Sequence, residues 1–257
     1  MIDGSPPPVV FFHLFKCGGT SVIHRLRRSV PRGRFLHVRD PRAFAAGLAA
    51  DPAEARRYRA VAGHLDIGLL AEHFADAHWA TVLRDPVDRM LSQYHHFRRA
   101  AETPGDTGSE GHRFRAAFCA ENDLAAFVAS DDPRLTVYTR NFMARKLAGR
   151  PPGGAADEAG LAAAALDALA RFSVVGTTDT LDATFLPEIE RLAGGRRARL
   201  ALPGRRANVS AARRDRRPAL DRGLLAAILD ANRVDALIYA AARWFDPTRA
   251  AIAGGTP

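Results

Sequence analysis

The sequence predicts an α/β protein built as a three-layer sandwich around a central, mainly parallel sheet. Short apolar runs of strand composition alternate along the chain with segments of helical periodicity. Two of these runs end in a glycine pair or an Asp-Pro pair, as expected where a strand turns into a helix. With 257 residues, 47% of them hydrophobic, the chain can bury one large core. We therefore expect a single domain over residues 1–257, with a Pro-rich lead-in at 1–8 and a tail at 246–257.

The first predicted strand and the turn after it organise the rest of the chain. Residues 9–14 are apolar apart from His13 and predict a buried strand in which His13 is a hydrogen-bonded core residue. Gly18 and Gly19 break this strand. The helix that follows, ending near residues 29–33, has two residues of N-cap type and then three apolar residues at helical spacing. These five residues are Thr20, Ser21, Val22, Ile23 and Leu26.

The later elements continue the alternation. The further predicted strands are 34–38, 59–64, 78–83, 172–176 and, at a sheet edge, 196–202. The predicted helices are 41–59, 69–77, a strongly amphipathic one from Pro86 through Phe97, 124–128, 138–147, 161–170, 181–192 and one or two within 220–245. We expect a polar, glycine-rich loop at 100–113, a linker at 151–154 and a basic loop at 205–218 that contains Arg213, Arg214, Arg216 and Arg217.

The turn at the glycine pair has the chemistry of an anion site. Free N–H groups and the positive end of a helix dipole attract phosphate or sulfate, and Lys16 adds a full charge at the mouth of the turn. Lys16 precedes the glycine pair, whereas the lysine of the nucleotide-binding loop G-x-x-x-x-G-K-[ST] follows the last glycine. The alternative interpretation is a plain strand-to-helix turn with an exposed lysine.

The second strand-to-helix junction, Arg84-Asp85-Pro86, is equally informative. Asp85 suits the N-cap and Pro86 the first helical position. Arg84 ends a strand, and the carboxyl ends of strands in open α/β sheets face the ligand. Ser92 lies two turns into the helix and off its apolar stripe, so both side chains could reach one anion. The alternative for Arg84 is a surface ion pair with Asp85 or Asp88.

Composition gives information on the cellular compartment of the protein and on the charge of its partners. The net charge is +9, and the chain has only two lysines, Lys16 and Lys146, among its 37 basic residues. A positive surface favours anionic ligands. The two cysteines, Cys17 and Cys119, form neither a metal pattern nor a disulfide framework, which favours a reducing compartment. Cys17 is either a small residue filling the loop or a reactive thiol. We see no signal peptide or membrane span and expect a cytoplasmic protein.

Two motifs carry a family resemblance. The segments F-F-H-L-F-K-C-G-G-T-S and T-V-L-R-D-P-V-D-R-M-L-S-Q-Y resemble the sulfotransferases that use 3′-phosphoadenosine 5′-phosphosulfate (PAPS). The likeness is to the carbohydrate branch, with heparan-sulfate 2-O-sulfotransferases and their bacterial relatives. Gly63-His64 resembles the G-H of that branch, V-V-G-T-T-D-T-L-D its strand-to-helix segment, and residues 138–149 with Asn141 its later helix. Phe15 stands where the branch has Pro, and Cys17 where it has Thr.

The resemblance implies a P-loop-like sulfotransferase fold and a set of roles. PAPS would be the co-substrate, no metal would be needed, and the acceptor would be a hydroxyl of a carbohydrate, such as an anionic saccharide, or of a glycosylated small molecule. Lys16 and His64 would be catalytic, His64 as the general base, and Arg84 and Ser92 would bind the 3′-phosphate. The residues implied to bind the 5′-phosphosulfate are Lys16, Cys17, Gly18, Gly19, Thr20 and Ser21.

Other interpretations remain. A P-loop kinase would need ATP and Mg²⁺, and the order of lysine and glycines argues against it. A basic nucleic-acid-binding protein would show steep salt dependence, but the aromatic and basic interleaving of common RNA modules is missing. An inactive relative of the sulfotransferases is the third alternative. We expect neither nucleic acid nor membrane as a partner.

Overall fold

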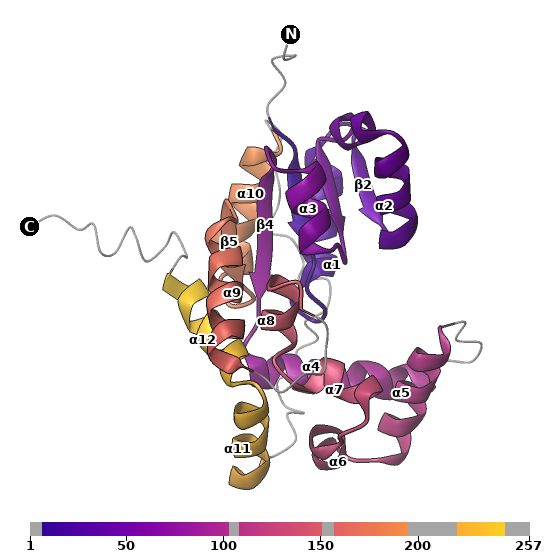
Figure 1. Cartoon of the computed structure of the whole chain (residues 1–257), viewed down its shortest axis with the longest axis vertical. Coiled ribbons are helices and arrows are strands. Elements are labelled where there is room, and N and C mark those ends of the chain that lie inside the picture. Colours follow the sequence, from indigo (N-terminus) through magenta and orange to yellow (C-terminus); the bar gives the residue numbers. More distant parts are fainter. Residues whose placement is uncertain (1–6, 103–107, 151–156, 195–219, 245–257) are drawn as a thin grey trace, which may run out of the picture. The chain divides into compact units, whose positions relative to one another are not determined.

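The computed structural model describes residues 7–102, 108–150, 157–194 and 220–244, which form two compact units (Figure 1). Within these residues, the first unit comprises 7–83, 166–194 and 241–244, and the second comprises the remainder. The prediction of one domain over the whole chain stays a prediction. The predicted strand at 196–202, linker at 151–154 and basic loop at 205–218 lie outside the described residues. None of the described helices is both long enough and apolar enough to span a membrane.

The first unit holds a five-stranded, all-parallel sheet with the strand order β2-β3-β1-β4-β5. This confirms the predicted α/β class and the parallel sheet. The strands are β1 (Val9–Phe12), β2 (Phe35–Val38), β3 (Ala60–Gly63), β4 (His78–Leu83) and β5 (Val174–Thr177). Because β1 is central, it pairs with β3 on one side and β4 on the other, and all four of its residues are at most 2% exposed.

Both faces of β1 are covered. Val9 and Phe11 share a core cluster with residues of α1 (Gly19–Ser29) and α10 (Leu186–Leu192). Successive strand residues point to opposite faces, and on the other face Phe12 contacts Phe172, with ring centroids 5.9 Å apart. In Figure 1, α3 (Ile67–His73) lies in front of the strands. A sheet between two packed layers is consistent with a three-layer sandwich.

Two predicted helices of this unit have different bounds. The predicted helix 41–59 is wrong, because α2 (Pro41–Ala50) ends before Asp51 and a 3-10 helix, η1 (Pro52–Arg57), follows it. A proline cannot continue a helix, since it lacks the N–H and clashes with the preceding turn. The helix predicted at 69–77 begins earlier, at Ile67, because the Asp66 carboxylate accepts a hydrogen bond from the N–H of Gly68 at 2.8 Å. A π-helix, η2 (Leu181–Phe185), precedes α10.

The described part of the second unit is helical. It contains α4 (Pro86–Ala101), α5 (Glu110–Glu121), α6 (Leu124–Ala129), α7 (Pro133–Thr139), α8 (Phe142–Leu147) and α11 (Arg222–Ala231), while α9 (Glu158–Ala170) and α12 (Arg233–Trp244) each continue into the first unit. The apolar stripe predicted for α4 is confirmed. Its buried side chains include Met90, Leu91, Tyr94 and Phe97, which pack in one core cluster with residues of α5, α6, α7 and α11.

Two sequence predictions fail in this unit. The predicted loop 100–113 is too long, since α4 runs to Ala101 and α5 begins at Glu110, where the Ser109 hydroxyl accepts a hydrogen bond from the N–H of His112. The predicted helix 138–147 is two helices, because Asn141 has a left-handed backbone with φ of 45° and separates α7 from α8.

Candidate functional site

Adjacent strands of the first unit bring the Lys16 loop and His64 together. The loop follows β1, and His64 directly follows β3. Phe12 and Gly63 are register partners, and the N–H of His13 donates to the Gly63 carbonyl at 2.9 Å. The Nδ1 atom of His64 lies 2.7 Å from the His13 carbonyl oxygen. The two catalytic residues expected from the sequence thus lie on neighbouring segments at the carboxyl edge of the sheet.

The two glycines of the loop are required for different reasons. Gly18 has φ of 79°, in the left-handed region where side chains are strained. A Cβ atom on Gly19 would lie 1.9 Å from the Nε2 atom of His13, so the histidine ring occupies the space of a side chain. Lys16 also has a positive φ, of 66°, which is uncommon for a residue with a side chain.

The start of α1 differs from the other long helix starts in the described residues. Its N-cap residue, Gly18, has no side chain to cap it, and its first turn holds no acidic residue. Every other described α-helix of more than seven residues has a side-chain oxygen on its first N–H groups. These oxygens belong to Asp40, Asp85, Ser109, Asn141, Asp157 and Asp221. The first turn of α1, at the positive end of the helix dipole, therefore contributes no carboxylate of its own.

The ring of His64 is held in a stack of aromatic rings. Its centroid lies 3.7 Å from that of Phe15, with 5° between the planes, and 4.2 Å from that of His13, with 24°. Two near-parallel rings this close must lie on opposite faces of His64, so the imidazole is sandwiched. His13 also stacks with Phe11, with ring centroids 5.7 Å apart and 20° between the planes. Phe15, which departs from the family pattern, thus contacts the expected general base directly.

A backbone bond selects the tautomer of His64. A carbonyl oxygen only accepts, so the contact to the His13 carbonyl requires the proton of a neutral His64 ring to be on Nδ1. The lone pair is then on Nε2. This is the arrangement a histidine base needs, with one nitrogen anchored and the other able to take a proton.

His13 is a neutral ring and not the hydrogen-bonded strand residue that the sequence predicted. Burial, together with the positive charges of His64, His37 and Lys16, lowers the pKa of His13 to about 3. Its Nδ1 atom is buried and has no hydrogen-bond partner among the described residues. His13 lies one residue beyond β1, because β1 ends at Phe12. Its ring serves as a packing surface for His64 and Gly19.

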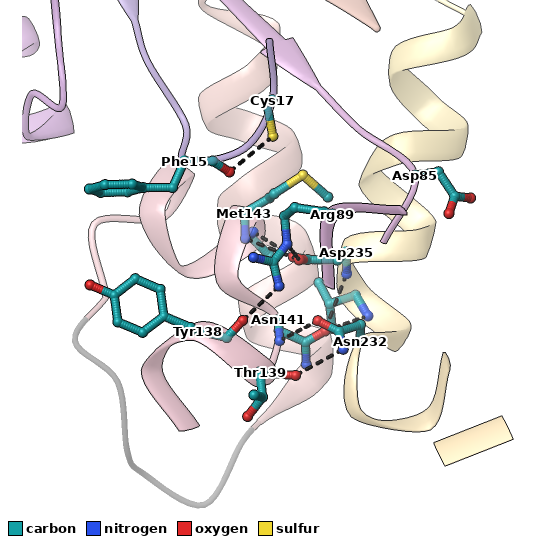
Figure 2. A network of polar contacts seen from close by, with 12 residues as sticks. Phe15, Cys17, Asp85, Arg89, Tyr138, Thr139, Asn141, Met143, Asn232 and Asp235 are labelled. Atoms are coloured by element: carbon teal, nitrogen blue, oxygen red, sulfur yellow. Dashed lines mark hydrogen bonds and ion pairs between the residues drawn. The ribbon is translucent and has the colours of Figure 1, made fainter. Parts of the chain in front are cut away.

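Cys17 fills the loop. The residue is 1% exposed. Its N–H donates to the Leu14 carbonyl at 3.3 Å, and its thiol donates to the Phe15 carbonyl at 3.5 Å, the second bond being drawn in Figure 2. This agrees with the interpretation of Cys17 as a small filling residue, because a reactive thiol needs access to its partner.

Arg84 and Ser92 belong to the second unit, whereas Lys16 and His64 belong to the first. Arg84 directly follows β4, as expected. The Asp85 carboxylate accepts hydrogen bonds from the N–H groups of Val87 and Asp88, both at 3.0 Å, which confirms the predicted start of α4. Ser92 is half-buried within α4 and outside its buried apolar stripe.

A buried polar network of the second unit, shown in Figure 2, was not predicted from the sequence. Arg89 and Asp235 are both 0% exposed, with the Nε atom of Arg89 4.0 Å from Oδ2 of Asp235. Arg89 also donates through Nη2 to the Tyr138 carbonyl at 2.6 Å. The Asp235 carboxylate accepts from the N–H groups of Met143 and Ala144 at 3.1 and 2.8 Å, so it caps α8. Arg89 is the second arginine of R-D-P-V-D-R. Its place in that motif was the one feature of the sequence that could have pointed to this network.

The two helix starts in this network cap each other. The side-chain oxygen of Asn141 accepts hydrogen bonds from the N–H groups of Val234 and Asp235, at 3.0 and 3.2 Å, and thereby caps α12. The amide of Asn232 donates to the Thr139 carbonyl, and its oxygen accepts from the Asn141 N–H. Burial raises the pKa of the Asp235 carboxyl, while Arg89 and the two N–H donors of α8 act in the opposite direction.

Comparison of the chain with models of known protein families finds no match, and comparison with curated proteins finds none either. No cluster of three or more potential metal-ligating side chains occurs among the residues that the structure describes. A functional proposal therefore rests on the site geometry and on the sequence motifs.

Proposed function

We propose that the protein is a PAPS-dependent sulfotransferase that modifies a hydroxyl of a carbohydrate or of a glycosylated small molecule. One observation carries the proposal. The α1 start, which has no carboxylate in its first turn and has Lys16 in the loop before it, lies beside a histidine whose Nδ1–H is held by a backbone carbonyl. An anion site next to an oriented base suits the transfer of an anionic group to a hydroxyl.

The α1 start suits the donor. PAPS supplies an activated sulfuryl group on a phosphate, and both carry negative charge. The first-turn N–H groups and Lys16 would bind the 5′-phosphosulfate, since the helix dipole and a lysine both attract an anion. Gly18 and Gly19 allow a close approach of the backbone because neither has a side chain. The proposed roles of Arg84 and Ser92 at the 3′-phosphate rest on the resemblance of residues 84–92 to the motif R-D-P-x-x-R-x-x-S.

His64 suits the acceptor. Through Nε2 it would take the proton from the acceptor hydroxyl as the oxygen bonds to sulfur, because Nδ1 already carries a proton and donates it to His13. Lys16 would stabilise the negative charge that develops on the leaving phosphate. The ring stack with Phe15 and His13 limits rotation of the imidazole, so Nε2 keeps its direction.

Calorimetry with 3′-phosphoadenosine 5′-phosphate, the expected product, in the absence of Mg²⁺ tests the proposal. We expect micromolar binding that Lys16→Ala and Arg84→Ala each weaken at least tenfold, about 1.4 kcal/mol. Arg28→Ala, on the exposed last turn of α1, is the matched control and should change the affinity less than twofold. His64→Asn should also leave this affinity unchanged, because His64 acts on the acceptor. Binding of ATP with Mg²⁺ in place of this nucleotide would reject the proposal and favour the kinase alternative.

A further inference from the structure

A basic cavity lies on the first unit between the end of α1 and the edge strand β2. It has a volume of about 460 Å³. Four basic side chains line it, which we call the arginine groove: Arg27, Arg32, His37 and Arg39. The remaining lining residues are apolar or glycine and include Phe35, whose ring lies 5.5 Å from the guanidinium carbon of Arg27.

The charges of the arginine groove are not compensated by the described residues. None of the lining residues is acidic, and none of the three arginines forms an ion pair within the part of the chain that the structure describes. The acidic residue next to Arg39 in the sequence is Asp40. Its carboxylate accepts hydrogen bonds from the N–H groups of Arg42 and Ala43, at 3.0 and 3.1 Å, and caps α2.

The cations also act on one another. Burial lowers the pKa of His37, and the positive charges of Arg39 and Arg27 lower it further. Positive charges that line one cavity favour the binding of an anion there. A guanidinium binds phosphate, sulfate and carboxylate through two parallel hydrogen bonds, and three exposed guanidinium groups line this cavity.

We propose that the arginine groove binds a small molecule that carries two or more oxyanion groups. The volume falls within the range of small-molecule pockets, roughly 300 to 1,000 Å³. Arg27 follows Gly19 by eight residues in α1, which is about 12 Å along the helix axis at 1.5 Å per residue. The groove is therefore separate from the α1 start, and this inference does not depend on the proposed function.

The probe for the test is inorganic tripolyphosphate, measured by calorimetry at 0.15 M salt. All variants are made in the Lys16→Ala background, so that the α1 start contributes less to binding. We expect a saturable site that Arg32→Ala with Arg39→Ala weakens at least tenfold. Arg28→Ala, which removes an equal charge from the same helix turn outside the groove, should change the affinity less than twofold.

The His37 ring provides a second, local measurement. In NMR titrations with saturating tripolyphosphate, the pKa of His37 should rise, because an oxyanion offsets the charges of Arg27 and Arg39. Equal affinity in the double variant and its parent would overturn the proposal, and so would an unchanged His37 titration. Binding of single-stranded RNA without saturable binding of tripolyphosphate would also overturn it, since the site would then be a surface for a polymer.

Discussion

Two helices of this protein, α1 and α8, begin after a residue with a left-handed backbone. The surroundings of their first-turn N–H groups differ. α1 follows Gly18, with φ of 79°, and α8 follows Asn141, with φ of 45°. Neither residue caps its own helix. At α8 the Asp235 carboxylate binds two first-turn N–H groups, whereas the first turn of α1 contains no acidic residue and follows Lys16. A buried helix start needs an internal anion, and a start at the edge of the sheet can take an external one.

The charged groups next to the starts of α8 and α1 also differ. Asp235 faces Arg89, so the α8 start combines a carboxylate with a guanidinium. At α1 the group against Gly19 is the neutral ring of His13, and the charged residue of the loop is Lys16. The α8 start has a carboxylate and a guanidinium beside it, while the first turn of α1 contains no acidic residue and follows the cationic Lys16. This difference is consistent with a structural role for the first and with the binding role that we propose for the second.

The largest expected effect follows from removing the internal anion of α8. Asp235→Ala should lower the free energy of unfolding by about 3 to 5 kcal/mol, because it leaves the buried charge of Arg89 without its carboxylate and α8 without its cap. Urea unfolding followed by circular dichroism measures the change. Asp230→Asn is the control, since Asp230 pairs with Arg233 on the exposed surface, and it should cost less than about 1 kcal/mol. Similar losses in the two variants would mean that the buried network adds no stability.

A smaller effect is expected from acid at the α1 start. The folded pKa of His13 is about 3, below the ordinary value of 6.5, so the unfolded chain binds the proton more tightly. The stability that comes from neutral His13 is fully present above pH 6.5 and is lost as the pH falls towards 3. Between pH 7 and pH 5 this loss is about 2 kcal/mol. Unfolding measured at both pH values should show it in the wild type.

The control for the pH effect is His13→Leu, which has no group to titrate at this position. Its stability should fall about 2 kcal/mol less than that of the wild type over the same interval, whatever its stability at pH 7. An equal pH dependence in both proteins would show that the pKa of His13 is the same in the folded and the unfolded chain.

The smallest effect on stability comes from giving α1 the carboxylate that it lacks. Thr20 is exposed in the first turn, and Thr20→Asp should stabilise the helix by about 0.3 to 1 kcal/mol through the dipole. The same change should weaken the binding of 3′-phosphoadenosine 5′-phosphate at least tenfold, since the new carboxylate repels the ligand. Thr20→Asn, without the charge, should keep the affinity within about threefold. Unchanged binding in both variants would place the anion elsewhere.

Much of the fold could be predicted because it depends on short-range patterns. The strand His78–Leu83, the existence of a strand near 172–176 (observed at Val174–Thr177) and the α4 start at Asp85 follow from apolar runs and cap chemistry within a few residues. The break at Asn141 could not be predicted in this way. Residues 138–147 have helical composition, and the left-handed turn exists because Asn141 caps α12, more than 90 positions away. The helix α5 was missed because its apolar periodicity is weak.

The features of the candidate site also fall into those that local sequence predicts and those that depend on distant contacts. The sequence by itself determined the glycine pair, Lys16 and the alternation that places Gly63-His64 at a strand end, because each is a local pattern. Only the tertiary structure decided that His13 and Phe15 enclose His64, that a backbone carbonyl selects its tautomer, and that Asp235 caps α8. These features depend on contacts between segments distant in the chain, such as His13 and His64, 51 positions apart. Such contacts cannot be predicted from sequence spacing, because they form only when the strands pair.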